Sequence, residues 1–180
     1  QGKMDFETSP RAYIPELNFY NAEMNNQITI KDLMTHRTGL PRHSAAWKAF
    51  KTPSKNEFIA RIAHQEPTAP VRSKFAYNNF MYFVQGEIAG RLTDKSWEQN
   101  IQQNILEPLQ MTNSTTNIQG LENGNNAALG YYFDNGITTE IDYYDIGAMS
   151  PAGGINSTVN DMSKWMIAWL NKGQYNGVQV

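Results

Sequence analysis

The sequence contains no cysteine. Disulfide bonds and metal sites built on thiolates are therefore excluded, whereas a cytoplasm and a bacterial periplasm fit the chain equally well. Long apolar runs are also absent, because none approaches the roughly 20 residues of a membrane-spanning helix. The first ten residues, QGKMDFETSP, lack the apolar centre of a signal peptide. We expect either a mature or truncated chain, or one that is never exported.

An excess of either charge is missing as well. The 180 residues include 15 basic and 17 acidic side chains, which gives a formal net charge of -2 without a basic stripe. Such a balance offers no electrostatic footprint for nucleic acid or for an anionic membrane. The 40% hydrophobic and 12% aromatic content is that of an ordinary globular protein. We predict a single folded domain over residues 1–180 and no nucleic-acid partner.

Four segments carry the capping-box signature of a helix start, in which two backbone N–H groups are satisfied reciprocally. They are Thr29–Asp32, Ser54–Glu57, Ser96–Gln99 and Thr158–Asp161. Apolar residues follow at helical spacing, and we interpret these stripes as core. The last stripe consists of Met162, Trp165, Met166 and Trp169. A further run, Phe80–Val84, is apolar around a full turn and predicts a central helix that is covered on most sides.

The character of the chain changes between Gly120 and Pro151. Aromatic and β-branched runs flank Asp134-Asn135-Gly136, which is a hairpin signal. The neighbouring segments are rich in glycine and asparagine and are typical of loops. The predicted fold class is mainly α, one helical domain with one small β-hairpin near 129–143.

Several signatures of hydrolytic chemistry are missing. The sequence has no Ser-x-x-Lys, no Gly-x-Ser-x-Gly and no His-Glu-x-x-His. The three histidines, His36, His43 and His64, are spaced too widely for a helical metal pair, so we predict no metal and no cofactor. His36 falls in the last turn of its predicted helix and His64 near another helix end, positions that favour structural roles.

Two short polar patterns remain as candidates. If Tyr77 to Asn79 is extended before the central helix begins, the period of two places the Tyr77 and Asn79 side chains on the same side. A lone Tyr-x-Asn is nevertheless common, and a buried tyrosine usually satisfies one hydrogen bond only. Gly153 and Gly154 precede the last capped helix, where they either let a ligand approach the backbone or simply form a tight turn. The residues alone leave both alternatives open.

Four segments in one order identify a family resemblance. They are GKMDFETSPRAYIPEL, ITIKDLMTHRTGLP, FAYNNFMYFVQGEIAGRLTDKSWEQNIQQNILEPLQMTNS and PAGGINSTVNDMSKWMIAWLNKG. Together they resemble the class C β-lactamase and penicillin-binding-protein-like serine hydrolases. The resemblance covers nearly the whole chain, from Gly2 to about Gly177.

The resemblance implies a fold and a site. In that family a helical region is inserted into an α/β region, the active site lies between the two, and the present chain resembles the helical region. The family's Ser-x-x-Lys and its Lys-Thr-Gly or His-x-Gly would lie outside these residues. Tyr77 would be the proton-transfer phenol, and Asn79 would hold a substrate carbonyl, with Gly153 and Gly154 as further substrate-binding candidates. Asn78 replaces a frequent serine, and we expect little effect because its side chain should point away from the cleft.

Three hypotheses follow. In the first, the chain is a fragment of a bacterial serine hydrolase that acts on a small amide or ester substrate, such as a β-lactam or a peptide, through an acyl-enzyme. The fragment itself would be inactive, would lack its α/β partner domain and would self-associate. In the second, the chain is a complete, non-catalytic binding module. In the third, it is a purely structural domain, which would require Tyr77 and Asn79 to be buried and fully paired. By resemblance, we expect a periplasmic or other extracytoplasmic location.

Overall fold

The computed structural model describes residues 2–43, 45–50 and 52–180. The chain forms two compact units. The first comprises the chain up to Trp97 together with Gly147–Gly153, and the second comprises Glu98–Ile146 together with Gly154–Val180. None of the described helices is long and apolar enough to cross a membrane.

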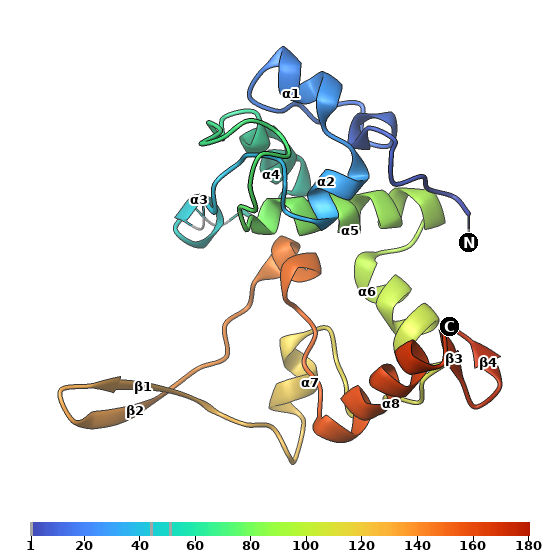
Figure 1. Cartoon of the computed structure of the whole chain (residues 1–180). Helices are drawn as coiled ribbons and strands as arrows, with labels where there is room; N and C mark the ends of the chain where they lie inside the picture. Colours follow the sequence, from blue (N-terminus) through green and yellow to red (C-terminus); the bar gives the residue numbers. More distant parts are fainter. Residues whose placement is uncertain (1, 44, 51) are drawn as a thin grey trace. The chain divides into compact units, whose positions relative to one another are not determined.

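The first unit is helical (Figure 1). Its elements are η1 (Pro10–Ala12), α1 (Ala22–Gln27), α2 (Ile30–Met34), α3 (Ala45–Lys48), α4 (Lys55–Ile62), α5 (Asn79–Thr93) and η3 (Gly147–Ala152). Helix α6 (Trp97–Ile101) begins at the last residue of this unit and continues into the second.

The second unit mixes short helices with two hairpins. It contains the π-helical turn η2 (Gln102–Leu106), α7 (Ile118–Glu122), β1 (Gly130–Asp134), β2 (Ile137–Ile141), α8 (Val159–Leu170), β3 (Gln174–Tyr175) and β4 (Val178–Gln179). An isolated antiparallel bridge joins Thr115 to Asn156.

Side-chain caps define several helix starts, as the sequence predicts. The Ser54 hydroxyl accepts from the Glu57 N–H at the start of α4, and the Thr158 hydroxyl accepts from the Asp161 N–H at the start of α8, each over 3.2 Å. At α2, the Thr29 N–H donates to Asp32 Oδ2 over 2.9 Å. These bonds satisfy N–H groups that have no partner within the helix.

Helix α5 is the centre of the first unit, as predicted. Its residues Phe80, Met81, Phe83, Val84 and Ile88 are fully buried. Helices α2 and α4 and the 3₁₀ turn η3 pack on it (Figure 1).

The contact between α5 and η3 depends on a glycine. A Cβ atom at Gly86 would lie 2.3 Å from Pro151 Cγ, far inside van der Waals contact. The absence of a side chain at Gly86 therefore lets η3 lie directly against the helix.

The expected fold class is wrong. Helices account for 41% and strands for 9% of the structure, and there are two small antiparallel sheets rather than one hairpin. β1 and β2 lie within the predicted region, with Gly130 paired to Ile141 and Asp134 to Ile137. The hairpin β3–β4 was not predicted, because two-residue strands show no alternation. Its turn, Asn176-Gly177, has two positive φ angles like Asn135-Gly136, so the missed signal was the turn itself.

The interpretation of the α8 stripe as core is wrong for Met162, Met166 and Trp169, whereas Trp165 is partly buried and packs against the core of the second unit. Met166 is 61% and Trp169 is 69% exposed, whereas the residues that α8 buries are Asp161 and Ala168. Ala168 packs with Leu106, Leu109 and Met111 in the core of the second unit. Helical spacing identifies an apolar face, but it does not show whether other residues of the chain pack over that face.

Asp32 anchors the segment that leads to Tyr77. Its two carboxylate oxygens accept from Arg72 Nε and Nη2 over 2.9 and 2.8 Å. The Arg72 N–H in turn donates to the Arg37 carbonyl over 2.7 Å. Burial works to raise the pKa of Asp32, but hydrogen bonds from Arg72 and Thr29 together outweigh it and hold the pKa below its ordinary value.

We expect Asp32→Ala to lower the free energy of unfolding by roughly 3 kcal/mol, because the Arg72 guanidinium loses two hydrogen bonds to a buried carboxylate and the Thr29 N–H loses its acceptor. Lys31→Ala is the matched control, since Lys31 is the neighbour of Asp32 on α2 and forms an exposed ion pair with Glu7. Its cost should stay within about 0.5 kcal/mol. Urea denaturation of both variants measures the difference, and equal losses would contradict the anchoring role of Asp32.

Candidate active site

Tyr77 lies in the extended segment just before α5. Its side chain is 41% exposed. Among the described residues its hydroxyl has no hydrogen-bond partner, and two side chains contact its ring. The His36 ring centroid lies 4.6 Å away, and Arg42 Cζ stands 5.5 Å from the Tyr77 ring centroid. The phenol is thus held by its ring while its hydroxyl stays available.

Asn78 is the N-cap of α5 and is completely buried. Its Oδ1 accepts from the Phe80 N–H over 2.8 Å, and its Nδ2 donates to the Pro41 carbonyl and to Gln65 Oε1, each over 2.8 Å. The side chain points into the protein, as expected for the middle of the motif. The sequence reading nevertheless missed its importance, although asparagine is among the preferred N-cap residues.

Asn79 is the first residue of α5 and is half-buried. Its Oδ1 is buried, and it has no hydrogen-bond partner among the described residues. Burying an acceptor without a donor costs about 1–3 kcal/mol. Tyr77 is exposed, Asn78 is buried and Asn79 is half-buried, although the chain is extended only up to Asn78 and α5 begins at Asn79. Among the described residues, the structure thus leaves an amide oxygen without a partner at Asn79 and a phenol hydroxyl available at Tyr77, two residues earlier in the chain.

His36 is buried beneath this segment. Helix α2 ends at Met34, so His36 lies beyond the helix rather than in its last turn, with a left-handed φ of 53°. Its Nδ1 accepts from the Asn78 N–H over 3.2 Å, and its carbonyl accepts from the Ala76 N–H over 2.8 Å. Because the imidazole is buried, the pKa of His36 lies below its ordinary value.

Gly153 and Gly154 fall at a boundary in the chain. Gly153 closes the segment that belongs to the first unit, and its N–H donates to the Ser150 carbonyl over 3.1 Å. Gly154 opens the segment that belongs to the second unit, and its carbonyl accepts from Asn156 Nδ2 over 3.2 Å. Both residues take part in turn hydrogen bonds, and their role in binding substrate stays a prediction.

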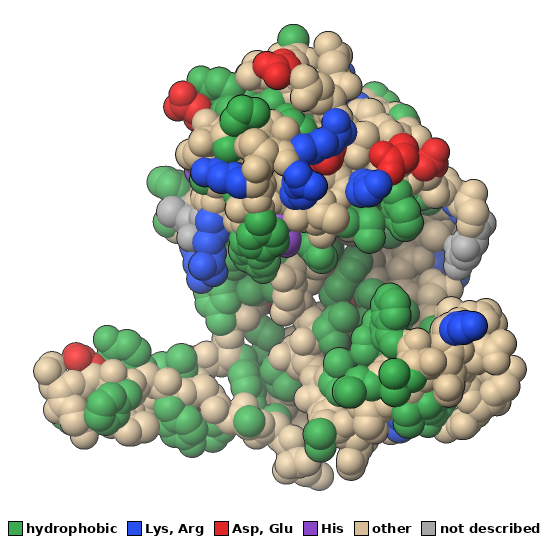
Figure 2. All heavy atoms as spheres, in the orientation of Figure 1, with side chains coloured by type: hydrophobic (Ala, Val, Ile, Leu, Met, Phe, Trp, Pro, Cys, Tyr) green, Lys and Arg blue, Asp and Glu red, His purple; other side chains and the backbone are tan. Residues whose placement is uncertain are grey.

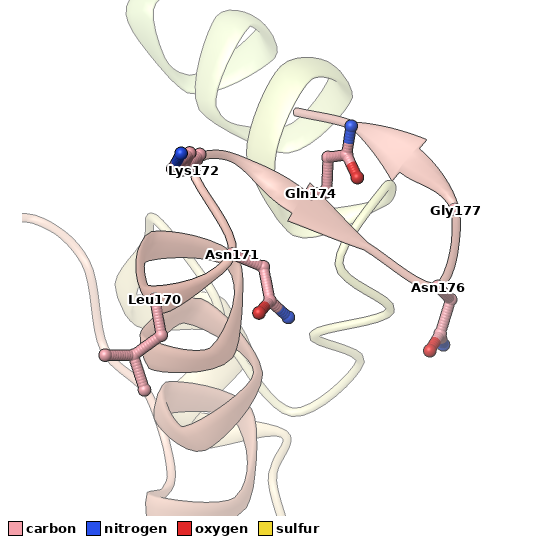
Figure 3. Close-up of a pocket in the computed structure, with 6 residues that line it drawn as sticks. All are labelled: Leu170, Asn171, Lys172, Gln174, Asn176 and Gly177. Atoms are coloured by element: carbon pink, nitrogen blue, oxygen red, sulfur yellow. The ribbon is translucent and has the colours of Figure 1, made fainter.

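Hollows in the described part of the second unit include the following pair. One, of about 400 Å³, lies between the end of α8 and the β3–β4 hairpin, and Lys172 is the single charged side chain among the residues that line it (Figure 3). The other, of about 670 Å³, is lined mainly by apolar side chains, among them Ile105, Trp165 and Trp169. Neither lining includes an acid or a histidine. In the described part of the chain no three His, Asp or Glu side chains cluster as a metal site would require.

The fold is that of penicillin-binding-protein-like and class C β-lactamase structures. The chain is similar to the octameric penicillin-binding protein homologue from Pyrococcus abyssi, with a TM-score of 0.82, 21% identity and coverage of 96% of this chain and 41% of that one. A class C β-lactamase gives a TM-score of 0.72 at 21% identity and covers 97% of this chain and 45% of its own. The Beta-lactamase family matches residues 1–179, and the chain belongs to that family.

Curated relatives include eukaryotic proteins. Beta-lactamase-like protein 1 of Dictyostelium discoideum is 28% identical over 207 residues, which cover 83% of this chain and 33% of the relative. An unguisins hydrolase of Aspergillus campestris is 27% identical over 153 residues, which cover 82% of this chain and 29% of the relative. The chain thus spans about a third of the length of these relatives, and members of the family are hydrolases.

We predict that Asn78→Ala destabilises the first unit by about 2–3 kcal/mol, because the Phe80 N–H loses its cap and two buried acceptors lose their donor. Asn78→Ser is the matched variant. Its hydroxyl can still cap the helix, so the loss should be about 1 kcal/mol smaller. Chemical denaturation gives both values, and an equal loss in the two variants would show that the cap contributes nothing.

Proposed function

We propose that the chain forms one wall of the active site of a serine hydrolase that cleaves a small amide or ester substrate through an acyl-enzyme. The observation that carries the proposal is the buried Asn79 Oδ1, which has no hydrogen-bond partner among the described residues and lies two positions after the exposed Tyr77 in the chain. An amide oxygen in that state calls for a donor from another molecule or from another part of the protein. A substrate amide N–H and a lysine ammonium are both suitable donors.

The proposed roles follow from side-chain chemistry. Tyr77 transfers a proton between the attacking hydroxyl and the leaving group, because a phenol both donates and accepts. Asn79 fixes the substrate through its amide. The nucleophile and its lysine come from outside residues 1–180, since the sequence has no Ser-x-x-Lys. For the same reason, the 180-residue chain by itself is inactive in this proposal.

The structural alternative finds no support at this site. A purely structural role for the motif requires Tyr77 and Asn79 to be buried and fully paired, whereas Tyr77 is exposed and Asn79 Oδ1 lacks a partner among the described residues. An extracytoplasmic location and a bacterial source rest on the resemblance alone. The relatives from Dictyostelium and Aspergillus show that the family is not confined to bacteria.

In a longer protein that carries the nucleophile, Tyr77→Phe should lower kcat by at least about tenfold, because a positioned proton-transfer group typically contributes 10²–10⁴-fold. Asn79→Ala should mainly lower kcat/KM, because the bound amide loses a hydrogen bond. Turnover of a chromogenic cephalosporin and of a short-chain ester provides the measurement.

Tyr82→Phe serves as the control, because the Tyr82 hydroxyl donates to the Met34 carbonyl and is already occupied. It should cost about 1 kcal/mol of stability and leave kcat unchanged. If Tyr77→Phe behaves like this control, with a lower melting temperature and normal turnover, the catalytic role of Tyr77 is refuted.

The α/β part of the same protein is the proposed partner of the exposed face of α8. Met162, Met166 and Trp169 form an apolar surface on this helix that the second unit does not bury. Contiguous exposed apolar patches of more than a few hundred Å² are uncommon on soluble monomers. In the absence of the partner, we expect this face to drive self-association of the 180-residue chain.

Sedimentation at rising concentration tests this expectation. Trp169→Glu should shift the chain toward the monomer, because it places a charge in the apolar face of α8. Phe133→Glu is the matched variant, since Phe133 on β1 is equally exposed at 69% and Figure 2 shows hydrophobic side chains gathered over the β1–β2 hairpin. Association that survives Trp169→Glu but not Phe133→Glu would place the interface on the hairpin and overturn the proposal for α8.

A further inference from the structure

His36 contacts Tyr77 and Asn78 and also the residues on either side of the candidate motif. Its ring lies 4.6 Å from the Tyr77 ring and stacks on the Tyr82 ring at 5.0 Å between centroids. Its Nδ1 accepts from the Asn78 N–H, and its carbonyl accepts from the Ala76 N–H. One buried residue thus contacts the ring of the candidate phenol, the cap of α5 and, through its carbonyl, Ala76 just before them.

We propose that His36 is a positioning residue for the active site, and that its neutral imidazole holds Tyr77 and Asn79 in their working geometry. The inference rests on the proposed function, because it assigns His36 a role in turnover as well as in folding. His36 acts through Asn78 and Tyr77, and no contact between His36 and substrate is required.

The hydrogen bond to Asn78 requires the neutral ring. A neutral imidazole has one nitrogen that accepts, whereas an imidazolium donates from both nitrogens. Protonation would therefore set a ring N–H against the Asn78 N–H across 3.2 Å. Because the Asn78 side chain caps the Phe80 N–H, displacement of Asn78 also releases the first turn of α5.

The surroundings of His36 favour the neutral form. The groups that face its ring are the edge of Phe75 and the phenols of Tyr77 and Tyr82. Beyond Tyr77 stands the Arg42 guanidinium, and the carboxylate of Asp32, one turn earlier in the chain, is already paired with Arg72.

The pKa of His36 is lowered by burial, so the unfolded chain takes up this proton at a higher pH than the folded chain. The contribution of the neutral ring is complete above the unfolded pKa of about 6.5. It is lost as the pH falls through the folded value. Loss of positioning should therefore appear on the acid side of neutrality.

His36→Asn is the informative variant. Asparagine tolerates the left-handed φ of 53° better than most residues and keeps an acceptor oxygen, but it does not titrate. His64→Asn is the control, because His64 is exposed and its N–H forms an ordinary turn bond with the Arg61 carbonyl.

The first measurement uses the 180-residue chain and needs no activity. Nitrogen-15 NMR should detect a coupling across the hydrogen bond between the Asn78 amide nitrogen and His36 Nδ1 at about pH 7.5. The coupling should vanish as His36 becomes protonated. Hydrogen exchange of the Phe80 amide with solvent should become faster over the same pH range. An unchanged Phe80 amide below the measured pKa of His36 would overturn the proposal.

The second measurement is the pH profile of kcat in the longer protein. Below the pKa that NMR gives for His36, kcat should fall about tenfold per pH unit in the unsubstituted protein and in His64→Asn, and the fall should be absent in His36→Asn. If His36 had a structural role alone, His36→Asn would lower stability, but kcat would still fall on the acid side of the profile. If Tyr77→Phe is inactive and His36→Asn keeps the limb, the inference on His36 fails while the proposed function survives. If Tyr77→Phe retains full turnover, both fail.

Discussion

The candidate site depends on how the free backbone N–H groups at the start of α5 are satisfied. A helix begins with N–H groups that have no partner in the helix, and Asn78 supplies an acceptor from a fully buried position. The same side chain donates to Gln65 and to the Pro41 carbonyl. Tyr77 and Asn79 therefore flank a residue that has no access to solvent, and the hydrogen bonds of that residue hold the backbone between them. A rigid backbone at this point is what a positioned catalytic pair needs.

Much of this arrangement could be predicted from the sequence, because its signals are local. Capping residues predicted the starts of α2, α4 and α8, and the apolar run from Phe80 predicted a buried central helix. The turn Asn135-Gly136 located the hairpin β1–β2, whereas the same turn chemistry at Asn176-Gly177 was overlooked because its strands are only two residues long. Short-range chemistry thus predicts elements well wherever they are long enough to show a period.

The parts that could not be predicted depend on contacts between distant residues. The periodicity of α8 does not show whether its apolar face is buried within the unit or exposed. The sequence therefore places Trp169 in the core. The environment of His36 comes from Phe75, Tyr77 and Tyr82, which are more than thirty residues away along the chain. From the sequence, the position of His36 near a helix end suggests an interaction with the helix dipole. In the structure, the ring is buried and its Nδ1 accepts a hydrogen bond from the Asn78 N–H.

The close approach of Gly86 to Pro151 has a consequence for the order of folding. The first unit is made from the chain up to Trp97 and from the distant segment Gly147–Gly153. Helix α5 is therefore synthesised well before the turn η3 that packs on it. Until that later segment has left the ribosome, part of the apolar surface of α5 lacks its native cover. Contacts of such long sequence separation form slowly, and the nascent chain must meanwhile protect this surface from other chains.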